Sequence, residues 1–171
     1  SYGLLSPSER TLLNRLAVFT GGFSLAAAEA VCAFPFNTPA LSPGHETPAG
    51  KPDFTDSLAK LLDHSLLMRQ KASPAAAESR FLMLETIREF AQEQLQASSE
   101  LELLKQRHAE YFTAWAEQAE SHLYGPKQAA WLTCMELDAD NLRFALSWSL
   151  DADRAEMAAR IVNALAVFWR R

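Results

Sequence analysis

The stretch Phe81–Leu95, FLMLETIREFAQEQL, decides the fold, because its hydrophobic pattern changes period within a few residues. Its first four residues, FLML, form a short apolar run that predicts a strand buried on both faces. Beyond it, apolar residues recur at the spacing of one helix face: Leu84, Ile87, Ala91 and Leu95. Thr86 and Glu89 have the spacing of a capping box at a helix start. We therefore predict a strand that runs directly into an amphipathic helix.

Three helices and a hairpin are predicted to build the region around this stretch. Helix start signals stand at Ser6, where Pro7 and Glu9 complete a capping box, and at Ser24 and Asp53. Gly21-Gly22 is expected to end the first helix, because glycine accepts the left-handed conformation of many helix exits. Short strands are predicted at Leu66–Gln70 and Arg80–Leu84. Three helices followed by a hairpin is the order of a winged-helix domain, which we place at residues 1–97.

Residues 35–52 interrupt this domain with a different composition. They contain five of the eight prolines of the chain, together with Gly44 and Gly50. Such a segment cannot continue a helix or a strand, so it is predicted to be a mobile surface loop.

From Ser99 onward the hydrophobic pattern is helical throughout. Ser99 with Glu102, and Asp153 with Glu156, have capping-box spacing, and Gly125-Pro126 breaks the pattern between them. Consecutive antiparallel helices joined by short turns are typical of helical repeats. We therefore predict a mainly α protein in which residues 98–171 begin a tetratricopeptide-like repeat domain. The apolar stripe reaches the chain end, so the array is expected to continue beyond Arg171.

Composition restricts the function further. The net charge is −5, with eight Lys and Arg against ten Asp and Glu in residues 1–97 and eight against eleven in residues 98–171. An acidic balance in both halves disfavours binding to nucleic acid, which requires a basic face. Cys32 and Cys134 are far apart and have no partners at metal-ligand spacing, so both are expected to be reduced core thiols. Without an apolar run of membrane-spanning length, the chain is predicted to be cytoplasmic.

Four segments together resemble a known protein class. They are Leu5–Phe23 (LSPSERTLLNRLAVFTGGF), Leu58–Leu67 (LAKLLDHSLL), Arg80–Ala91 (RFLMLETIREFA) and Trp131–Trp148 (WLTCMELDADNLRFALSW). The first three are similar to the winged-helix segments of large bacterial transcriptional regulators built on a STAND-class ATPase. The fourth is similar to the motif that opens their repeat region. The resemblance covers nearly all of the chain except the proline-rich loop.

The resemblance implies a regulatory function without catalysis in this part of the protein. In that class a P-loop ATPase module precedes the winged helix and binds ATP or ADP, so no cofactor is expected on the present chain. The winged helix acts as a lid that responds to the nucleotide. The downstream helical repeats receive an inducer or a protein effector. The implied partners are therefore the ATPase module, the further repeats and an unknown effector.

One triplet departs from the class pattern. Related switch proteins carry Met-His-Asp where this chain has Met83-Leu84-Glu85. Leu84 cannot donate a hydrogen bond to a phosphate, whereas Glu85 keeps a carboxylate. Glu85 and Arg88 are thus the candidate contacts to the ATPase module or its nucleotide. The alternative is a local ion pair, since they lie three residues apart on a helix.

A second hypothesis is that the chain is a winged-helix DNA-binding factor with a helical dimerisation tail. A winged helix often reads the major groove with its third helix. Here that helix carries Lys60 as its one basic residue among Asp53, Asp56 and Asp63. The wing adds three scattered cations: Arg69, Lys71 and Arg80. These four basic residues are the candidate DNA contacts, and direct DNA binding is not expected.

An enzyme is the third hypothesis, and no catalytic or metal-binding pattern supports it. His108 lies on an apolar stripe and is expected to be buried and hydrogen-bonded rather than to bind a ligand. The carboxylates Glu89, Glu93, Asp138 and Asp140 are expected to be solvated. A catalytic function would need a pocket with perturbed titrating groups.

Overall fold

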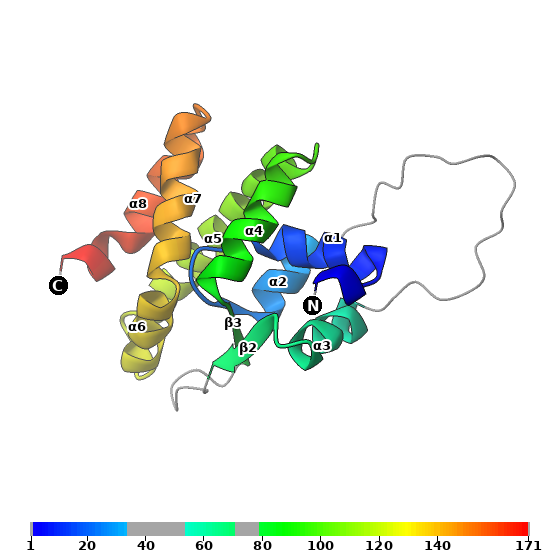
Figure 1. Cartoon of the computed structure of the whole chain (residues 1–171). Coiled ribbons are helices and arrows are strands. Elements are labelled where there is room, and N and C mark those ends of the chain that lie inside the picture. The colour runs from blue at the N-terminus through cyan, green and yellow to red at the C-terminus, as the bar shows by residue number, and fades with distance from the viewer. Residues whose placement is uncertain (1, 34–53, 71–78, 171) are drawn as a thin grey trace, which may run out of the picture.

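The computed structural model describes residues 2–33, 54–70 and 79–170 (Figure 1). The proline-rich loop predicted at 35–52 and the candidate DNA contact Lys71 lie outside the described residues. The described part is mainly helical with one small antiparallel sheet, which confirms the predicted fold class. In chain order its elements are η1 (Tyr2–Leu4), α1 (Pro7–Leu16), β1 (Phe23–Ser24), α2 (Leu25–Cys32), α3 (Phe54–Asp63), β2 (Leu67–Gln70), β3 (Arg80–Met83), α4 (Glu85–Gln96), α5 (Leu101–His122), α6 (Gln128–Leu137), α7 (Ala139–Asp151) and α8 (Ala155–Trp169).

The predicted change from strand to helix at Phe81–Leu95 is confirmed. β3 ends at Met83 and α4 begins two residues later, at Glu85. The sheet has the order β1-β3-β2, so β3 pairs on both sides. Its Phe81 lies opposite Phe23 of β1 and Arg69 of β2. β1 escaped prediction because two residues are too few to show the alternation that identifies a strand.

Helix starts were predicted with mixed success. The Ser6 box is present: the Glu9 amide donates to Ser6 Oγ at 3.3 Å, and the Ser6 amide donates to Glu9 Oε2 at 2.9 Å. Ser24 caps α2 by accepting from the Ala27 amide at 3.1 Å. The box predicted at Thr86 is wrong, because α4 starts one residue earlier and follows Leu84, which makes no side-chain cap. Strand pairing up to Met83 fixes that start instead.

The other two predicted boxes are also wrong. α5 begins at Leu101 behind Glu100, and α8 begins at Ala155 behind Arg154, and neither preceding residue caps through its side chain. In both places the polar spacing is present, but the chain enters the helix through a tight turn that positions the apolar face. Asp153 adopts a positive φ of 55° in the turn before α8.

The first helix ends earlier than predicted. α1 stops at Leu16, and residues 17–20 form a turn that buries Phe19 at 1% exposure. Burial of this ring draws the chain inward before Gly21-Gly22. Gly21 has a φ of 82°, so the left-handed conformation expected of this pair occurs in the loop rather than at the helix end.

One hydrophobic core runs through both predicted domains. It joins leucines of α1 and the rings of Phe19 and Phe23 to Leu104 and Phe112 of α5. The ring of Phe19 lies 4.8 Å from that of Phe23 and 6.3 Å from that of Phe112. The boundary placed at residue 97 stays a prediction, and the residues on its two sides pack into the same core.

The helices after residue 98 are arranged around α5. α5 contacts α2 on the winged-helix side and packs against α7 and α8 on the other side, and α7 also packs against α8 (Figure 1). α6 also contacts both α5 and α7, and Met135 is its one fully buried residue. The tetratricopeptide-like character of this part stays a prediction.

Candidate functional site

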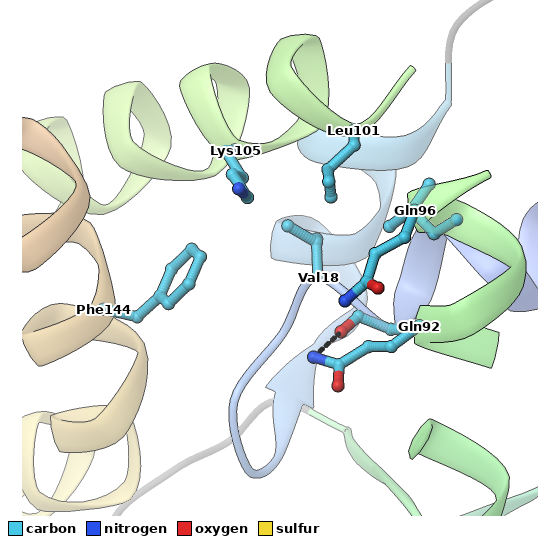
Figure 2. A pocket seen from close by; sticks show the side chains of 8 residues that line it. Val18, Gln92, Gln96, Leu101, Lys105 and Phe144 are labelled. Atoms are coloured by element: carbon cyan, nitrogen blue, oxygen red, sulfur yellow. Dashed lines mark hydrogen bonds between the residues drawn. The ribbon is translucent and has the colours of Figure 1, made fainter. Parts of the chain in front are cut away.

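A crevice lies where α4, α5 and α7 meet (Figure 2). Its volume is about 90 Å³, and its lining is largely apolar, with Val18, Leu101 and Phe144 among the side chains. Its polar side chains are Gln92, Gln96 and Lys105, and the first and last of these have partners. Gln92 Nε2 donates to the Ala17 carbonyl oxygen at 3.4 Å, and Lys105 Nζ lies 2.9 Å from Glu102 Oε1. We find no catalytic set among the described residues that line this crevice.

Within residues 2–33, 54–70 and 79–170, no group of three or more His, Cys, Asp or Glu side chains is placed to hold a metal ion. No helix in the described part of the chain is both long enough and apolar enough to cross a bilayer.

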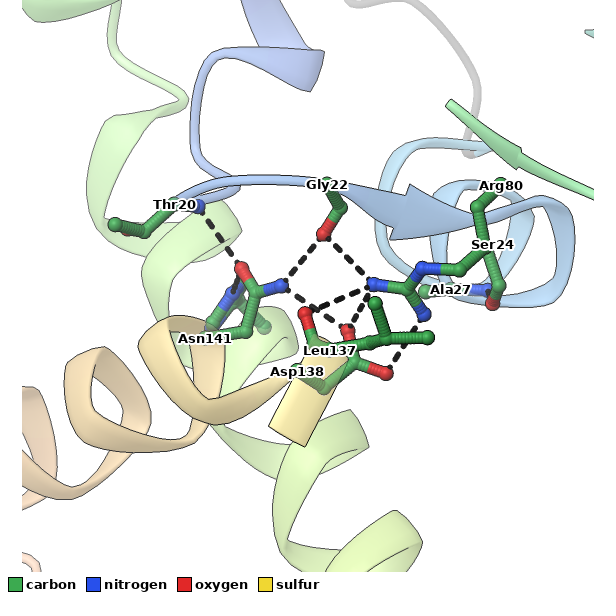
Figure 3. Close-up of polar contacts among 9 residues, drawn as sticks. Thr20, Gly22, Ser24, Ala27, Arg80, Leu137, Asp138 and Asn141 are labelled. Atoms are coloured by element: carbon green, nitrogen blue, oxygen red, sulfur yellow. Dashed lines mark hydrogen bonds and ion pairs between the residues drawn. The ribbon is translucent and has the colours of Figure 1, made fainter. Parts of the chain in front are cut away.

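A buried polar junction connects the winged-helix part to the α6–α7 corner (Figure 3). We use the name polar junction for six residues: Thr20, Gly22, Arg80, His108, Asp138 and Asn141. At its centre Arg80 Nη1 donates to Asp138 Oδ2 at 2.9 Å, and Nη2 donates to Oδ1 at 2.8 Å. Both side chains are 7% exposed. Arg80 Nη2 also donates to the carbonyl oxygens of Leu137 (3.2 Å) and Gly22 (3.3 Å).

Asn141 completes the junction and is fully buried. Its Nδ2 donates to the Gly22 carbonyl at 2.9 Å and to Asp138 Oδ1 at 3.3 Å, and its Oδ1 accepts from the Thr20 amide at 2.9 Å. The same Oδ1 lies 3.2 Å from His108 Nε2. An amide oxygen only accepts, so we assign the imidazole proton to Nε2. This one side chain therefore connects α7, α5 and the loop before β1.

His108 is neutral in this environment, and its predicted buried, hydrogen-bonded state is confirmed. Its ring contacts those of Phe19, Phe112 and Phe144, at centroid distances of 5.4, 4.6 and 5.1 Å. Burial lowers the pKa of His108 to about 4, and the hydrogen bond with Asn141 opposes that shift only in part. Nδ1 has no hydrogen-bond partner among the described residues.

Gly22 is required at its position because the backbone approaches other groups closely. A Cβ there would lie 3.0 Å from Gln70 Oε1 and 3.2 Å from the carbonyl oxygen of Phe81. The carbonyl of Gly22 accepts from both Arg80 and Asn141. A side chain at this residue would therefore require Gln70 or the Phe81 carbonyl to shift by a few tenths of an ångström.

A second group of polar contacts joins the winged-helix part to the helices that follow it, near the start of α5. Arg15 is fully buried and donates to both carboxylate oxygens of Glu100, at 2.9 and 2.6 Å, and to the Cys32 carbonyl at 3.1 Å. Arg107 of α5 donates to the carbonyl oxygens of Val31 (3.0 Å) and Ala30 (2.7 Å) near the end of α2. The winged-helix part is thus fixed to α5 at one end and to the α6–α7 corner at the other.

The candidate ATPase contacts pair with each other. Arg88 Nε and Nη2 donate to the two carboxylate oxygens of Glu85 at 3.1 and 2.6 Å. The hydrogen bond from Arg88 lowers the pKa of Glu85, whose side chain is 64% exposed. The local ion pair that the spacing allowed is therefore present. A contact from Glu85 or Arg88 to an ATPase module stays a prediction.

The candidate DNA contacts do not converge on one surface. Lys60 Nζ lies 3.1 Å from Glu9 Oε1 but its side chain is 60% exposed, and it shares the exposed surface of α3 with Asp56 and Asp63. Arg69 is exposed on β2. Arg80 is buried in the polar junction, so its assignment as a surface wing cation was wrong.

The burial of Asp138, at the corner between α6 and α7, was predicted wrongly from the sequence. Asp138 was expected to be solvated but is 5% exposed, because Arg80 neutralises it inside the protein. Nothing near Asp138 in the sequence indicates a partner 58 residues away. The available signal was Asn141, a polar residue three positions on, whose neighbours at helical spacing include the apolar residues Leu137, Phe144 and Ala145.

Comparison with known proteins finds relatives among regulators. Three mycobacterial proteins, one from Mycobacterium bovis and two from strains of Mycobacterium tuberculosis, are 32% identical to this chain over 173 aligned positions. All three are named HTH-type transcriptional regulators. The alignment covers 99% of the chain and 17% of each relative, so the chain spans about a sixth of their length. No family model matches the chain, and no solved structure matches it.

Proposed function

We propose that this chain is a non-catalytic regulatory module of a transcriptional regulator, in which a winged helix is fixed to the first helices of a larger helical domain. The observation that carries the proposal is the polar junction, where Arg80, Asp138 and Asn141 bind the two parts together. The shared hydrophobic core supports the same conclusion. Such a fixed connection suits a module that transmits movement between neighbouring domains rather than one that catalyses a reaction.

The relatives support the transcriptional context of this proposal. Their names describe proteins about six times as long as the present chain. An HTH-type regulator contains a DNA-binding segment, and the names do not say whether the aligned sixth is that segment. The choice between a coupling function and a DNA-binding function therefore depends on the surface of this chain.

A finer form of the proposal is that the module couples an upstream ATPase, switched by ATP and ADP, to an effector-sensing helical repeat. It rests on the family resemblance, and the exposed pair of Glu85 and Arg88 is its candidate contact. Sequencing the flanking coding region is the first test, since a P-loop upstream of Ser1 is expected. A flanking region without one would refute this form.

The second test uses the full-length protein. Replacing Glu85 and Arg88 by glutamine should change nucleotide turnover or release. The matched control is the Asp140–Arg143 pair, which has the same spacing and is exposed on both sides. Equal effects from the two pairs, or no effect from either, would refute a specific contact at α4.

Direct DNA binding is the second candidate function, and the names of the relatives favour it at least as well as the first. Arg69 on β2 and Lys60 on α3 are the exposed candidate cations among the described residues. Against it stand the acidic face of α3, the Lys60–Glu9 pair and the burial of Arg80. A winged helix that binds DNA needs cations on the surfaces that face phosphate.

A salt titration distinguishes the two functions. Binding of the chain to a random DNA duplex is measured at micromolar protein between about 50 and 200 mM salt. A coupling module should show no binding at moderate salt. Salt-dependent binding that Arg69→Gln weakens, while the control Arg143→Gln does not, would establish the DNA-binding function instead.

A further inference from the structure

We infer that Arg80 is a latch through which the wing of the winged helix holds α6 in place, so that displacement of the wing would release this helix. The wing is the hairpin formed by β2 and β3. This inference goes beyond the proposed function, because it concerns which segment moves when the wing moves. It holds whether the wing contacts DNA or another protein module.

Apart from its contact with Arg80, α6 is held mainly by half-buried side chains, among them Trp131, whose ring centroid lies 6.1 Å from that of Trp115 on α5. Met135 is its one fully buried residue, whereas Trp131, Leu132, Thr133 and Cys134 are all half-buried. At its start, Gln128 Nε2 donates to the Leu123 carbonyl at 2.6 Å, and Trp131 stacks on His122 with ring centroids 4.7 Å apart. A short helix with so little buried surface has little local stability of its own.

Arg80 caps the far end of α6. Its Nη2 donates to the carbonyl oxygen of Leu137, the last residue of the helix. A helix C-terminus leaves carbonyl groups without intrahelical partners and carries partial negative charge, so a guanidinium there is favourable. The same guanidinium holds Asp138, which lies between the end of α6 and the start of α7 (Figure 3). One side chain thus secures the corner between two helices.

The position of Arg80 is set by the sheet. It is the first residue of β3, paired with Gln70 on β2 and with Ser24 on β1. Its side chain leaves the strand toward α6, and Nη2 also binds the Gly22 carbonyl. Any shift of the hairpin therefore moves the cap of α6. The other helices of this part, α7 and α8, pack on α5 and on each other, so they have anchors besides the corner that Arg80 secures.

A polar latch differs from an apolar contact in how it separates. Its donors and acceptors can exchange their partners for water when the surfaces part, whereas separating apolar surfaces exposes them to water. Replacing a buried ion pair by apolar residues of similar size is often neutral or stabilising for the protein as a whole, but an apolar side chain cannot donate to the Leu137 carbonyl at the end of α6. The retained pair therefore suits a contact that has to release α6 in a working state.

The test is hydrogen exchange in a variant that removes the latch without stranding a buried charge. In Arg80→Met/Asp138→Leu, both charged partners are replaced by apolar side chains of similar length. We expect the amides of residues 128–137 to exchange faster by about tenfold or more, as expected on losing a charge-assisted hydrogen bond. The amides of α5 should be unchanged. Unchanged exchange in α6, or equal acceleration in α5 and α6, would overturn the inference.

A second variant covers the case in which the double variant does not fold. Arg80→Lys keeps the charge but cannot bind Asp138 and the Leu137 carbonyl as a planar fork. It should accelerate exchange in α6 by a smaller factor, again without change in α5. The matched control is Glu85→Leu/Arg88→Met, which removes the exposed pair on α4 and should leave α6 as in the natural protein. Acceleration of α6 by this control would also overturn the inference.

The two cysteines give an independent readout. Cys134 lies on α6, and Cys32 is fully buried in the core, where burial raises the pKa of its thiol. Thiol labelling of Cys134 should accelerate in Arg80→Met/Asp138→Leu, while labelling of Cys32 stays slow. A parallel rise at both thiols would indicate general unfolding and would contradict a local latch.

Discussion

Two arginine–carboxylate pairs in this protein have almost the same geometry and different consequences. On α4, Arg88 donates two hydrogen bonds to the carboxylate of Glu85, at 2.6 and 3.1 Å. In the polar junction, Arg80 donates two hydrogen bonds to the carboxylate of Asp138, at 2.8 and 2.9 Å. The first pair spans three residues and is exposed, whereas the second spans 58 residues and is buried. The same kind of ion pair therefore lies on the surface of α4 in the first case and joins two distant parts of the chain in the second. What differs is the solvent around the charges and the length of chain between them.

The largest expected difference between the two regions is the cost of removing one partner. Asp138→Leu alone should lower the free energy of unfolding by about 3–5 kcal/mol, because it leaves the Arg80 charge buried and uncompensated. Arg80→Met/Asp138→Leu should recover most of that loss. Urea unfolding monitored by circular dichroism measures both. If the double variant were no more stable than the single one, the pair would not be energetically coupled.

Acidification should also distinguish the junction from the surface. The pKa of His108 is about 4 in the folded protein, below the ordinary histidine value of 6.5. Between these values the unfolded chain binds a proton that the folded protein does not, so stability is full above pH 6.5 and falls as the pH falls. The pKa difference corresponds to about 3 kcal/mol by pH 4.

His108→Gln provides the control for this pH effect. The variant lacks the titrating ring, so its stability should lose the part of the pH dependence that lies between pH 6.5 and 4. Denaturant unfolding at a series of pH values measures the slope for both proteins. An unchanged slope in His108→Gln would assign the acid sensitivity to the carboxylates instead.

The two glycine positions Gly22 and Gly3 test how tightly the junction is packed. Gly22→Ala should destabilise the protein by about 1–3 kcal/mol, because the new methyl group meets Gln70 and the Phe81 carbonyl. Gly3→Ala is the matched control, since its Cβ would have no neighbour within 4 Å. Thermal unfolding of the two variants gives the comparison, and equal melting temperatures would show that the loop can move away from the junction.

Disrupting the exposed Glu85–Arg88 pair should have the smallest effect on the free energy of unfolding. Removing one partner by Glu85→Gln should lower stability by about 0.2–0.5 kcal/mol, an effect that added salt should diminish. The same measurement in 1 M NaCl checks the screening. A loss above 1 kcal/mol would mean that this pair has a structural function that its exposure does not suggest.

The same contrast explains which features could be predicted from the sequence. The Glu85–Arg88 pair, the Ser6 cap and the change from β3 to α4 depend on residues a few positions apart, so local spacing was sufficient. The Arg80–Asp138 pair and strand β1 depend on chain segments that meet only after folding. The polar junction was therefore missed, although the burial of its member His108 followed from the apolar stripe of α5.

The length of α5 has a mechanical consequence. Its 22 residues span about 33 Å, with α2 secured near one end and α7 and α8 packed along the rest. A stiff cylinder of this length works as a lever arm, so that a tilt of about 5° at the Arg107 end displaces the opposite end by about 3 Å. Movement too slight to disturb the winged helix itself would thus be magnified at the His122 end of α5, where Trp131 of α6 stacks.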